Sequence, residues 1–172
     1  MGIMIEIVGF NKKYSEKFFM LNKAWIEESW HLEDSDKKDL LYPDQIFENG
    51  GQVFFALENK IAIGTVAMIK NSDDRFELAK MTVQDDFRGK GIANMLMDEC
   101  LKFAKENKAK EIFLISNDSL RIARNLYDKY GFKEVKLDSQ KYLRGNVKMS
   151  LKITINYLVV WCILKNVWYS SI

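Results

Sequence analysis

The segment from Phe76 to Ala93, FELAKMTVQDDFRGKGIA, decides the fold. Its first half favours a strand, and the loop that follows leads into a helix predicted over Lys90–Asn107, whose apolar residues recur at helical spacing. The amino terminus of a helix leaves backbone N–H groups unpaired, and these attract anions. Gly89 and Gly91 allow the backbone to approach a phosphate closely, and the basic residues beside them add positive charge. The segment therefore predicts a phosphate-binding turn between a strand and a helix.

The sequence before this segment predicts an antiparallel meander. Two apolar runs, Gln52–Leu57 and Ile61–Ile69, are separated by three polar residues, which is typical of a hairpin. The strand over Phe76–Gln84 follows another polar turn, so three consecutive strands are expected to pair in order. Ahead of the meander we expect a strand, a helix, a polar loop and a short helix, over Ile3–Val8, Tyr14–Glu28, His31–Lys38 and Asp44–Glu48.

The sequence after the phosphate-binding turn predicts a parallel strand and a closing hairpin. Ile112–Ser116 is a short apolar run, typical of a strand covered on both faces. Strand, helix and strand have the lengths of one crossover unit, so this run should lie parallel to Phe76–Gln84. A helix and an antiparallel pair complete the domain, over Ser119–Tyr130, Phe132–Leu137 and Asn146–Leu151. The predicted fold is α/β with a mixed, mostly antiparallel sheet in residues 1–151, followed by an apolar tail, 152–172, of unknown role.

Composition limits the classes of function. The chain has 172 residues, of which 48% are hydrophobic and 29% charged, and a net charge of +2, so we expect one globular domain and no nucleic-acid partner. Cys100, Cys162 and His31 have no further ligands at metal-binding spacing, so no metal is expected. The first residues lack a signal-peptide pattern, and the apolar run Tyr157–Leu164 is too short to span a bilayer. We therefore expect a cytoplasmic protein with no membrane partner.

The anion at the turn can be narrowed by comparison with known phosphate-binding motifs. A Walker A loop would end in Gly-Lys-Ser/Thr, and this turn does not. A dinucleotide-binding fold would need Gly or Ala at Asn94, and an acid after the next strand, where Ser116 and Asn117 stand. The candidate left is the pyrophosphate of coenzyme A.

Two motifs resemble those of the GNAT N-acetyltransferase superfamily. The first signature, Gln/Arg-x-x-Gly-x-Gly/Ala, is met by Arg88–Ala93. The second, Ala-x-x-Leu-Tyr-x-x-x-Gly-Phe, is met at Ala123, Leu126, Tyr127, Gly131 and Phe132. Both lie on the expected elements in the order of the family, and the resemblance covers about residues 3–151.

The resemblance implies a central pair of parallel strands that splay apart, flanked by helices, with acetyl-CoA as co-substrate and no metal. The pantetheine arm would lie between these strands, bonded by the backbone of Met81 and Val83 with Thr82 between them. Many family members carry Asn where Leu120 stands, and Asn117 at the strand end is expected to replace it. The residues expected to hold the pyrophosphate are Arg88, Gly89, Lys90, Gly91, Ile92 and Ala93.

The resemblance also implies the catalytic groups. Direct attack of a neutral amine on the thioester needs one proton taken from the amine and one returned to the leaving thiolate. Tyr127 stands at the usual general-acid position of the family; without the motif it would be read as a core tyrosine. Glu77 resembles the position of the base in the histone-acetylating branch, and strand alternation places it on the Met81 side. The alternatives for the base are that Glu77 forms only a cross-strand ion pair, that His31 serves instead, or that ordered water suffices.

Five residues are expected to form the acceptor site. The aromatic side chain would give a wall, two carboxylates would hold an ammonium group, and the last two residues would bind an anionic end: Trp25, Glu33, Asp36, Tyr142 and Arg144. The expected function is that of an acyltransferase, an N-acetyltransferase moving acetyl from acetyl-CoA to a primary amine of a small molecule. The alternatives are a protein or peptide N-acetyltransferase and a CoA-binding regulatory module without turnover. A homodimer is left open.

Overall fold

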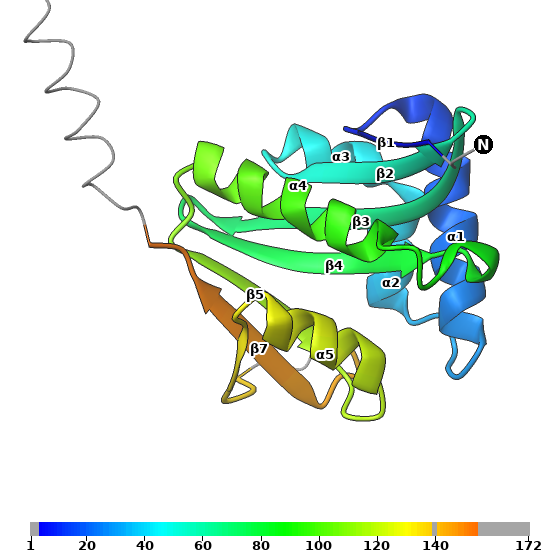
Figure 1. The fold of residues 1–172 in the computed structure, drawn as a ribbon. Helices are drawn as coiled ribbons and strands as arrows, with labels where there is room; N and C mark the ends of the chain where they lie inside the picture. Colours follow the sequence, from blue (N-terminus) through cyan, green and yellow to red (C-terminus); the bar gives the residue numbers. More distant parts are fainter. Residues whose placement is uncertain (1–3, 139–140, 155–172) are drawn as a thin grey trace, which may run out of the picture.

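The protein, a computed structural model describing residues 4–138 and 141–154, is built on one seven-stranded sheet in the order β1-β2-β3-β4-β5-β7-β6 (Figure 1). The strands are β1 (Ile5–Val8), β2 (Gln52–Glu58), β3 (Ile61–Ser72), β4 (Arg75–Val83), β5 (Glu111–Ser116), β6 (Lys133–Val135) and β7 (Val147–Lys152). The helices are α1 (Ser15–Glu27), α2 (Asp34–Leu41), α3 (Pro43–Glu48), α4 (Ile92–Glu106) and α5 (Arg121–Lys129), with short 3-10 turns η1 (Lys12–Tyr14) and η2 (Asp85–Phe87).

β4 and β5 form the parallel pair of this sheet, and the other neighbouring strands are antiparallel. The predicted mixed, mostly antiparallel α/β fold is therefore confirmed. Pairing between β4 and β5 extends only from Arg75 opposite Glu111 to Glu77 opposite Phe113. Beyond this point the two strands diverge towards their carboxyl ends, as Figure 1 shows. The second half of β4 thus has no β5 partner along that edge.

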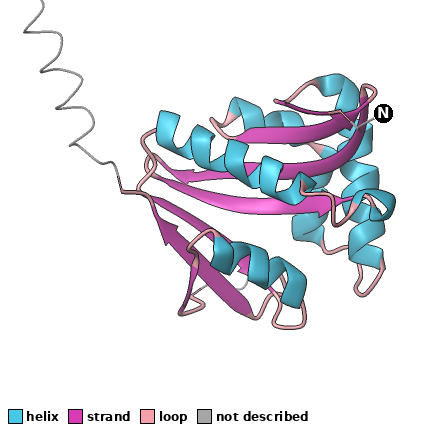
Figure 2. Cartoon of the chain, viewed as in Figure 1, coloured by secondary structure: helices cyan, strands magenta, loops and turns pink. Residues whose placement is uncertain are grey.

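Helices cover both faces of the sheet (Figure 2). Successive side chains of a strand point to opposite faces, and β2 shows this clearly. Phe54 packs in one core with Leu96 of α4 and Tyr127 of α5, whereas Phe55 packs in the other with Phe18 of α1 and Leu40 of α2. Each face of the sheet is therefore closed by its own set of helices.

A bulge interrupts β4. The β3–β4 register shifts between Thr65 and Ala67, so that Lys80 and Met81 oppose a single residue of β3. Lys80 has a φ of 54°, in the left-handed region that few non-glycine residues occupy. The Thr65 hydroxyl donates to the Lys80 carbonyl at 3.0 Å and accepts from the side-chain amide of Asn22 at 3.0 Å. The bulge is therefore held by a chain of hydrogen bonds that starts in α1.

The bulge makes the predicted placement of Glu77 wrong. Met81 packs against the core on the α4 side, together with Phe76. Glu77 instead pairs with Lys141, which also pairs with Asp39 of α2, on the opposite face. One inserted residue reverses the alternation beyond it, so two residues four apart in sequence no longer share a face.

The polar loop predicted over His31–Lys38 is wrong for most of its length, because α2 begins at Asp34. Its residues are mostly charged, so it has no long apolar stripe that would indicate a helix. Glu33 is the N-cap of the helix: its N–H donates to the Asp36 carboxylate at 3.2 Å, and its backbone carbonyl accepts from the Asp36 N–H at 3.1 Å. Asp36 is fully buried, which a loop prediction could not anticipate.

β7 is the last element of the described residues. β7 ends at Lys152, and the next N–H, that of Ile153, donates to the Lys110 carbonyl at 2.8 Å. Most of the predicted apolar tail, residues 155–172, lies outside the described residues. Within residues 4–138 and 141–154, no helix has the length and apolar character needed to cross a membrane.

Candidate active site

A cleft of about 940 Å³ opens where β4 and β5 diverge. β4 contributes every residue from Glu77 to Val83, and the start of α4, the β5–α5 loop and α5 complete the walls. Its volume suits a large ligand that enters between the strands. Because β4 lacks a β5 partner here, its backbone groups can pair with an extended ligand as they would with a strand.

Most residues predicted for the site line this cleft. They are Trp25, Glu77, Met81, Thr82, Val83, Arg88, Gly89, Gly91, Ile92, Ala93, Asn117, Tyr127, Tyr142 and Arg144. Lys90, Glu33 and Asp36 do not line it. Lys90 lies over the ring of Phe87, with its Nζ 4.9 Å from the ring centroid. The two acids lie in an ionic cluster described below.

Two glycines shape the turn at the start of α4. Gly89 has a φ of 76° and Gly91 a φ of 80°, values that other residues adopt only with strain. Gly91 is the N-cap of α4, so the N–H groups of the first helical turn are left without helical partners. A Cβ atom on either glycine would meet no atom within 4 Å, so the space beside the turn is open. Open space next to unpaired N–H groups fits a pyrophosphate.

Arg88 is engaged by the protein itself. Its Nε donates to the Val83 carbonyl at 3.0 Å, and its Nη2 lies 2.8 Å from Asp85 and 3.2 Å from Glu28. Arg88 therefore ties the end of β4 to α1 across the turn. Because two carboxylates share its charge, a phosphate at the turn would depend mainly on the backbone N–H groups.

Tyr127 of α5 borders both the cleft and the core. Its ring packs against Phe132, with the centroids 6.0 Å apart. Burial raises the pKa of the Tyr127 hydroxyl to about 12, and the neighbouring Cys100 adds to this effect. In the described part of the chain no polar atom hydrogen-bonds this hydroxyl. A phenol that is protonated at neutral pH and has no protein acceptor can donate its proton to a group in the cleft.

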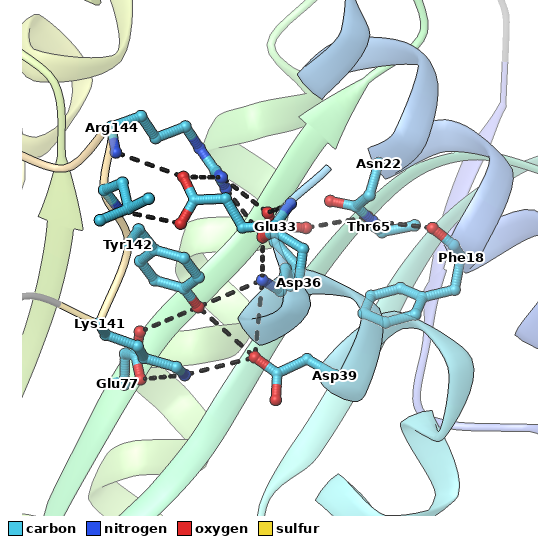
Figure 3. A network of polar contacts seen from close by, with 12 residues as sticks. Phe18, Asn22, Glu33, Asp36, Asp39, Thr65, Glu77, Lys141, Tyr142 and Arg144 are labelled. Carbon is cyan, nitrogen blue, oxygen red and sulfur yellow. Dashed lines mark hydrogen bonds and ion pairs between the residues drawn. The ribbon is translucent and has the colours of Figure 1, made fainter. Parts of the chain in front are cut away.

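An ionic cluster joins α2, β4 and the segment before β7 (Figure 3). We define it as four carboxylates, three cations and one phenol: Glu33, Asp36, Asp39, Glu77, Lys80, Lys141, Arg144 and Tyr142. Because the cations of the chain occupy its carboxylates, the cluster is not a metal site. Elsewhere in the described residues, too, no group of His, Cys, Asp and Glu is arranged to hold a metal ion.

Asp36 is the centre of the ionic cluster. Its Oδ1 accepts from Lys80 Nζ at 2.8 Å and from Arg144 Nη2 at 2.8 Å, and its Oδ2 accepts from Arg144 Nη1 at 2.6 Å. Burial alone would raise the pKa of Asp36, but Arg144 and Lys80 outweigh it and hold the pKa at about 2. Asp36 was predicted to bind the ammonium group of a substrate. In the structure it binds the ammonium group of Lys80 instead.

Glu77 lies where the cleft closes, in the last paired position of β4 and β5. Its Oε2 accepts from Lys141 Nζ at 2.9 Å, and the carboxylate is buried. Burial alone would lower the pKa of Lys141, but the charges of Glu77 and Asp39 outweigh it and raise the pKa. Glu77 therefore both borders the cleft and forms the ion pair that was weighed as its alternative role.

The part of the cleft predicted to bind the acceptor has aromatic walls. Trp25 and Trp30 pack together with their ring centroids 5.8 Å apart, and both line the cleft. Tyr142 is buried beside Lys80, whose Nζ lies 3.2 Å from its hydroxyl. Burial, followed by the nearby carboxylates, raises the pKa of Tyr142 well above its usual value. His31, the other predicted base, is exposed between α1 and α2 and does not line the cleft.

Three members of the ionic cluster were missed by sequence analysis: Asp39, Lys80 and Lys141. A signal did exist for Lys80, because a lysine between the apolar residues Ala79 and Met81 of a strand must either reach solvent or find a buried partner. Asn117 has a structural role as well: its side-chain amide donates to the Arg144 carbonyl at 2.6 Å, and its oxygen accepts from the Ser119 N–H. It therefore links the β5–α5 loop to the segment before β7.

Comparison with proteins of known sequence identifies relatives. The chain is 34% identical over 133 residues to N-acetylaspartate synthetase of Xenopus tropicalis, covering 75% of this chain and 45% of that protein. It is 26% identical over 122 residues to human N-acetyltransferase 8B, covering 68% of this chain and 53% of that protein. The chain thus spans about half the length of these curated relatives.

Comparison with solved structures identifies the same fold. A GNAT-family acetyltransferase of Staphylococcus aureus Mu50 superposes with a TM-score of 0.81 at 24% identity, covering 88% of this chain and all of that one. The PaiA N-acetyltransferase of Thermoplasma acidophilum, solved in complex with coenzyme A, superposes with a TM-score of 0.73 at 17% identity, covering 88% of this chain and 100% of that one.

The family itself is shown by the sequence. The profile of the acetyltransferase (GNAT) family matches residues 17–132, which include most of the cleft lining, the glycine turn and Tyr127. This confirms the predicted family, its enzyme class and acetyl-CoA as the donor that the family uses. The chain belongs to the GNAT family of acetyltransferases.

Proposed function

We propose that this chain is an acetyl-CoA-dependent N-acetyltransferase that moves an acetyl group to a primary amine of a small molecule. One observation carries the proposal: the glycine turn and Tyr127 line the same cleft between diverging strands. The turn can hold an anionic carrier, and the phenol can protonate a leaving group beside it. Family membership supports this combination of roles.

The cleft residues would hold the donor mainly through their backbone. The N–H groups of Gly89–Ala93 would bind the pyrophosphate, because they lie at the start of α4 beside open space, whereas the Arg88 N–H donates to the Asp85 carbonyl at 3.0 Å. Met81 and Val83 would pair with the pantetheine arm, because β4 has no β5 partner at this position. Thr82 and Asn117 line the same space. Acetyl-CoA supplies an activated thioester that a neutral amine attacks directly, releasing the thiolate.

Tyr127 would act as the general acid. Tyr127 lines the cleft, its phenol is protonated at neutral pH, and its hydroxyl has no hydrogen-bond acceptor among the described residues. Transfer of its proton to the departing thiolate would neutralise the leaving group, and the phenolate would regain a proton from water.

Glu77 would act as the general base. It borders the cleft at its closed end and is buried, so a proton from the attacking amine could reach it directly or through one water molecule. Lys141, 2.9 Å away, would stabilise the ionised carboxylate before the transfer. Proton uptake by Glu77 would weaken this ion pair, which limits the rate enhancement that the base can give.

The acceptor proposed is a small amine of amino-acid type. The name of the relative N-acetylaspartate synthetase describes a product that is an N-acetylated amino acid, and this supports a small acceptor. Trp25, Trp30 and Tyr142 give the acceptor side an aromatic lining. Arg144 lines the same region, and its guanidinium is the kind of cation that binds a carboxylate well.

The proposal is tested by measuring free-thiol release from acetyl-CoA with a panel of small amines, amino acids and peptides, with mass spectrometry of the products. We expect thiol release matched by N-acetylation of small amines. Acetylation of peptides alone would overturn the acceptor class. CoA binding without release against any acceptor would indicate the regulatory module instead.

A further inference from the structure

We propose that the acceptor site contains a carboxylate-binding nest which the chain fills with its own Glu33, and that acceptor amines carrying a carboxylate displace this side chain. We define the nest as the backbone N–H groups of Leu143 and Arg144 together with the Arg144 guanidinium. The inference rests on the proposed acetyltransferase function and names the class of its acceptor. The chemistry recognised is that of an amine bearing a free carboxylate.

The contacts of Glu33 are those of a bound carboxylate ligand. One oxygen accepts from the Leu143 N–H at 2.8 Å, and the other accepts from the Arg144 N–H at 3.3 Å and from Arg144 Nη1 at 3.0 Å (Figure 3). Consecutive N–H groups that converge on one anion form a concave binding site, and a guanidinium adds a charge-assisted bond. A carboxylate from a small molecule would satisfy the same three donors.

The nest lies at the accessible rim of the cleft. Arg144 and its neighbours Tyr142 and Gly145 line the cleft, as does Trp30. The Leu143 side chain is 81% exposed, and that of Glu33 retains 17% exposure, so solvent reaches both members of this contact. A ligand in the cleft can therefore approach the nest without opening the core.

The carboxylate of a ligand can displace Glu33 but not Asp36. Asp36 is fully buried and is held by three hydrogen bonds from Arg144 and Lys80, so it is a fixed part of the ionic cluster. If Glu33 leaves, Arg144 keeps Asp36 as its partner, and Glu33 can move its charge into water. Replacement of Glu33 by an incoming carboxylate also leaves the charge of the cluster unchanged. Displacement of Glu33 is therefore the exchange that least disturbs the buried charges.

This arrangement predicts a competition that affects only some acceptors. An acceptor with a carboxylate must compete with Glu33 for the nest, whereas a neutral acceptor does not. Removing the Glu33 carboxylate should then lower KM for acids selectively. We expect KM for acids to fall about tenfold, because tenfold corresponds to the net free energy of about one charge-assisted hydrogen bond.

The test compares amino acids with their carboxamides, which keep the size and the amine but lose the carboxylate. Glu33→Ala should lower KM for alanine and aspartate about tenfold while KM for alaninamide changes less than twofold. The matched control is Asp34→Ala, which removes the same charge one residue away, where the side chain is exposed and pairs with Lys37. The control should leave both KM values unchanged. Equal changes for acids and amides, or an equal effect of the control, would overturn the nest.

A second measurement needs no variant. In the CoA-bound wild-type protein, alanine or aspartate should shift the backbone amide resonances of Leu143 and Arg144, and alaninamide should not. Unchanged resonances at saturating amino acid would refute displacement even if acetyl-CoA is turned over. Shifted resonances in a protein without turnover would instead support the nest and refute the proposed catalysis.

Discussion

Lys80→Met should destabilise the protein because it removes a buried charge from Asp36. Lys80 Nζ lies 2.8 Å from Asp36, and the two side chains are 4% and 0% exposed. Methionine fills a similar volume, so the change removes the ion pair with little loss of packing. It leaves Asp36 ionised and buried, with Arg144 as its remaining cation.

The magnitude follows from these contacts. Removing one partner of a buried ion pair costs about 3–5 kcal/mol in general. Because Arg144 still bonds both oxygens of Asp36, we expect the low end of that range, about 3 kcal/mol. In a domain of this size the melting temperature would fall by about 6–12 °C.

The assay is urea unfolding, with Lys102→Met as the matched control. Lys102 pairs with Glu99 one turn away, and its side chain is 62% exposed, so its loss should cost less than about 0.5 kcal/mol. The double variant Lys80→Met with Asp36→Asn should recover at least about 1 kcal/mol relative to the sum of the single changes. A cost for Lys80→Met no larger than the control, or strictly additive changes, would refute the role given to this pair.

Three further predictions concern the turn, the base and acid stability. Gly91→Glu should abolish CoA binding measured by calorimetry, because φ at Gly91 is 80° and the new carboxylate would enter the phosphate space; undiminished binding would remove the pyrophosphate assignment. Glu77→Gln should lower kcat about 100-fold with KM for acetyl-CoA unchanged, whereas a loss of stability alone would leave Glu77 as the ion-pair partner of Lys141. Because folding lowers the pKa of Asp36 from 3.8 to about 2, its contribution of about 2 kcal/mol is complete above pH 4 and is lost as the pH falls towards 2. Acid titration of unfolding should show this loss in the parent and not in Asp36→Asn.

The parts of the fold predicted from the sequence were those with a strong local pattern. The glycine turn has its own chemistry at Gly89 and Gly91, and α4 has an apolar stripe, so both could be read locally. The parallel pairing of β4 with β5 followed from the length of the connection between them. Local signals of this kind do not depend on the rest of the chain.

The parts that could not be predicted depend on contacts between distant residues. Glu33 was expected to bind an ammonium group and Arg144 a carboxylate. The two residues are 111 positions apart, so the sequence did not indicate that they bind each other. α2 has no long apolar stripe and is held by the buried charge of Asp36 together with the packing of Leu40. The bulge at Lys80 depends on Thr65 in the next strand, and it reversed the face on which Glu77 was expected.

The central claim is that Tyr127 protonates the leaving thiolate in the cleft that holds acetyl-CoA. The most direct test is the turnover of Tyr127→Phe, compared with Tyr130→Phe, which removes a hydroxyl at the C-cap of the same helix, where it bonds Asp98 and Asn94. We predict that Tyr127→Phe lowers kcat about 100-fold while the Kd for CoA changes less than twofold, and that Tyr130→Phe leaves kcat unchanged. Turnover by Tyr127→Phe equal to that of the parent would contradict the claim.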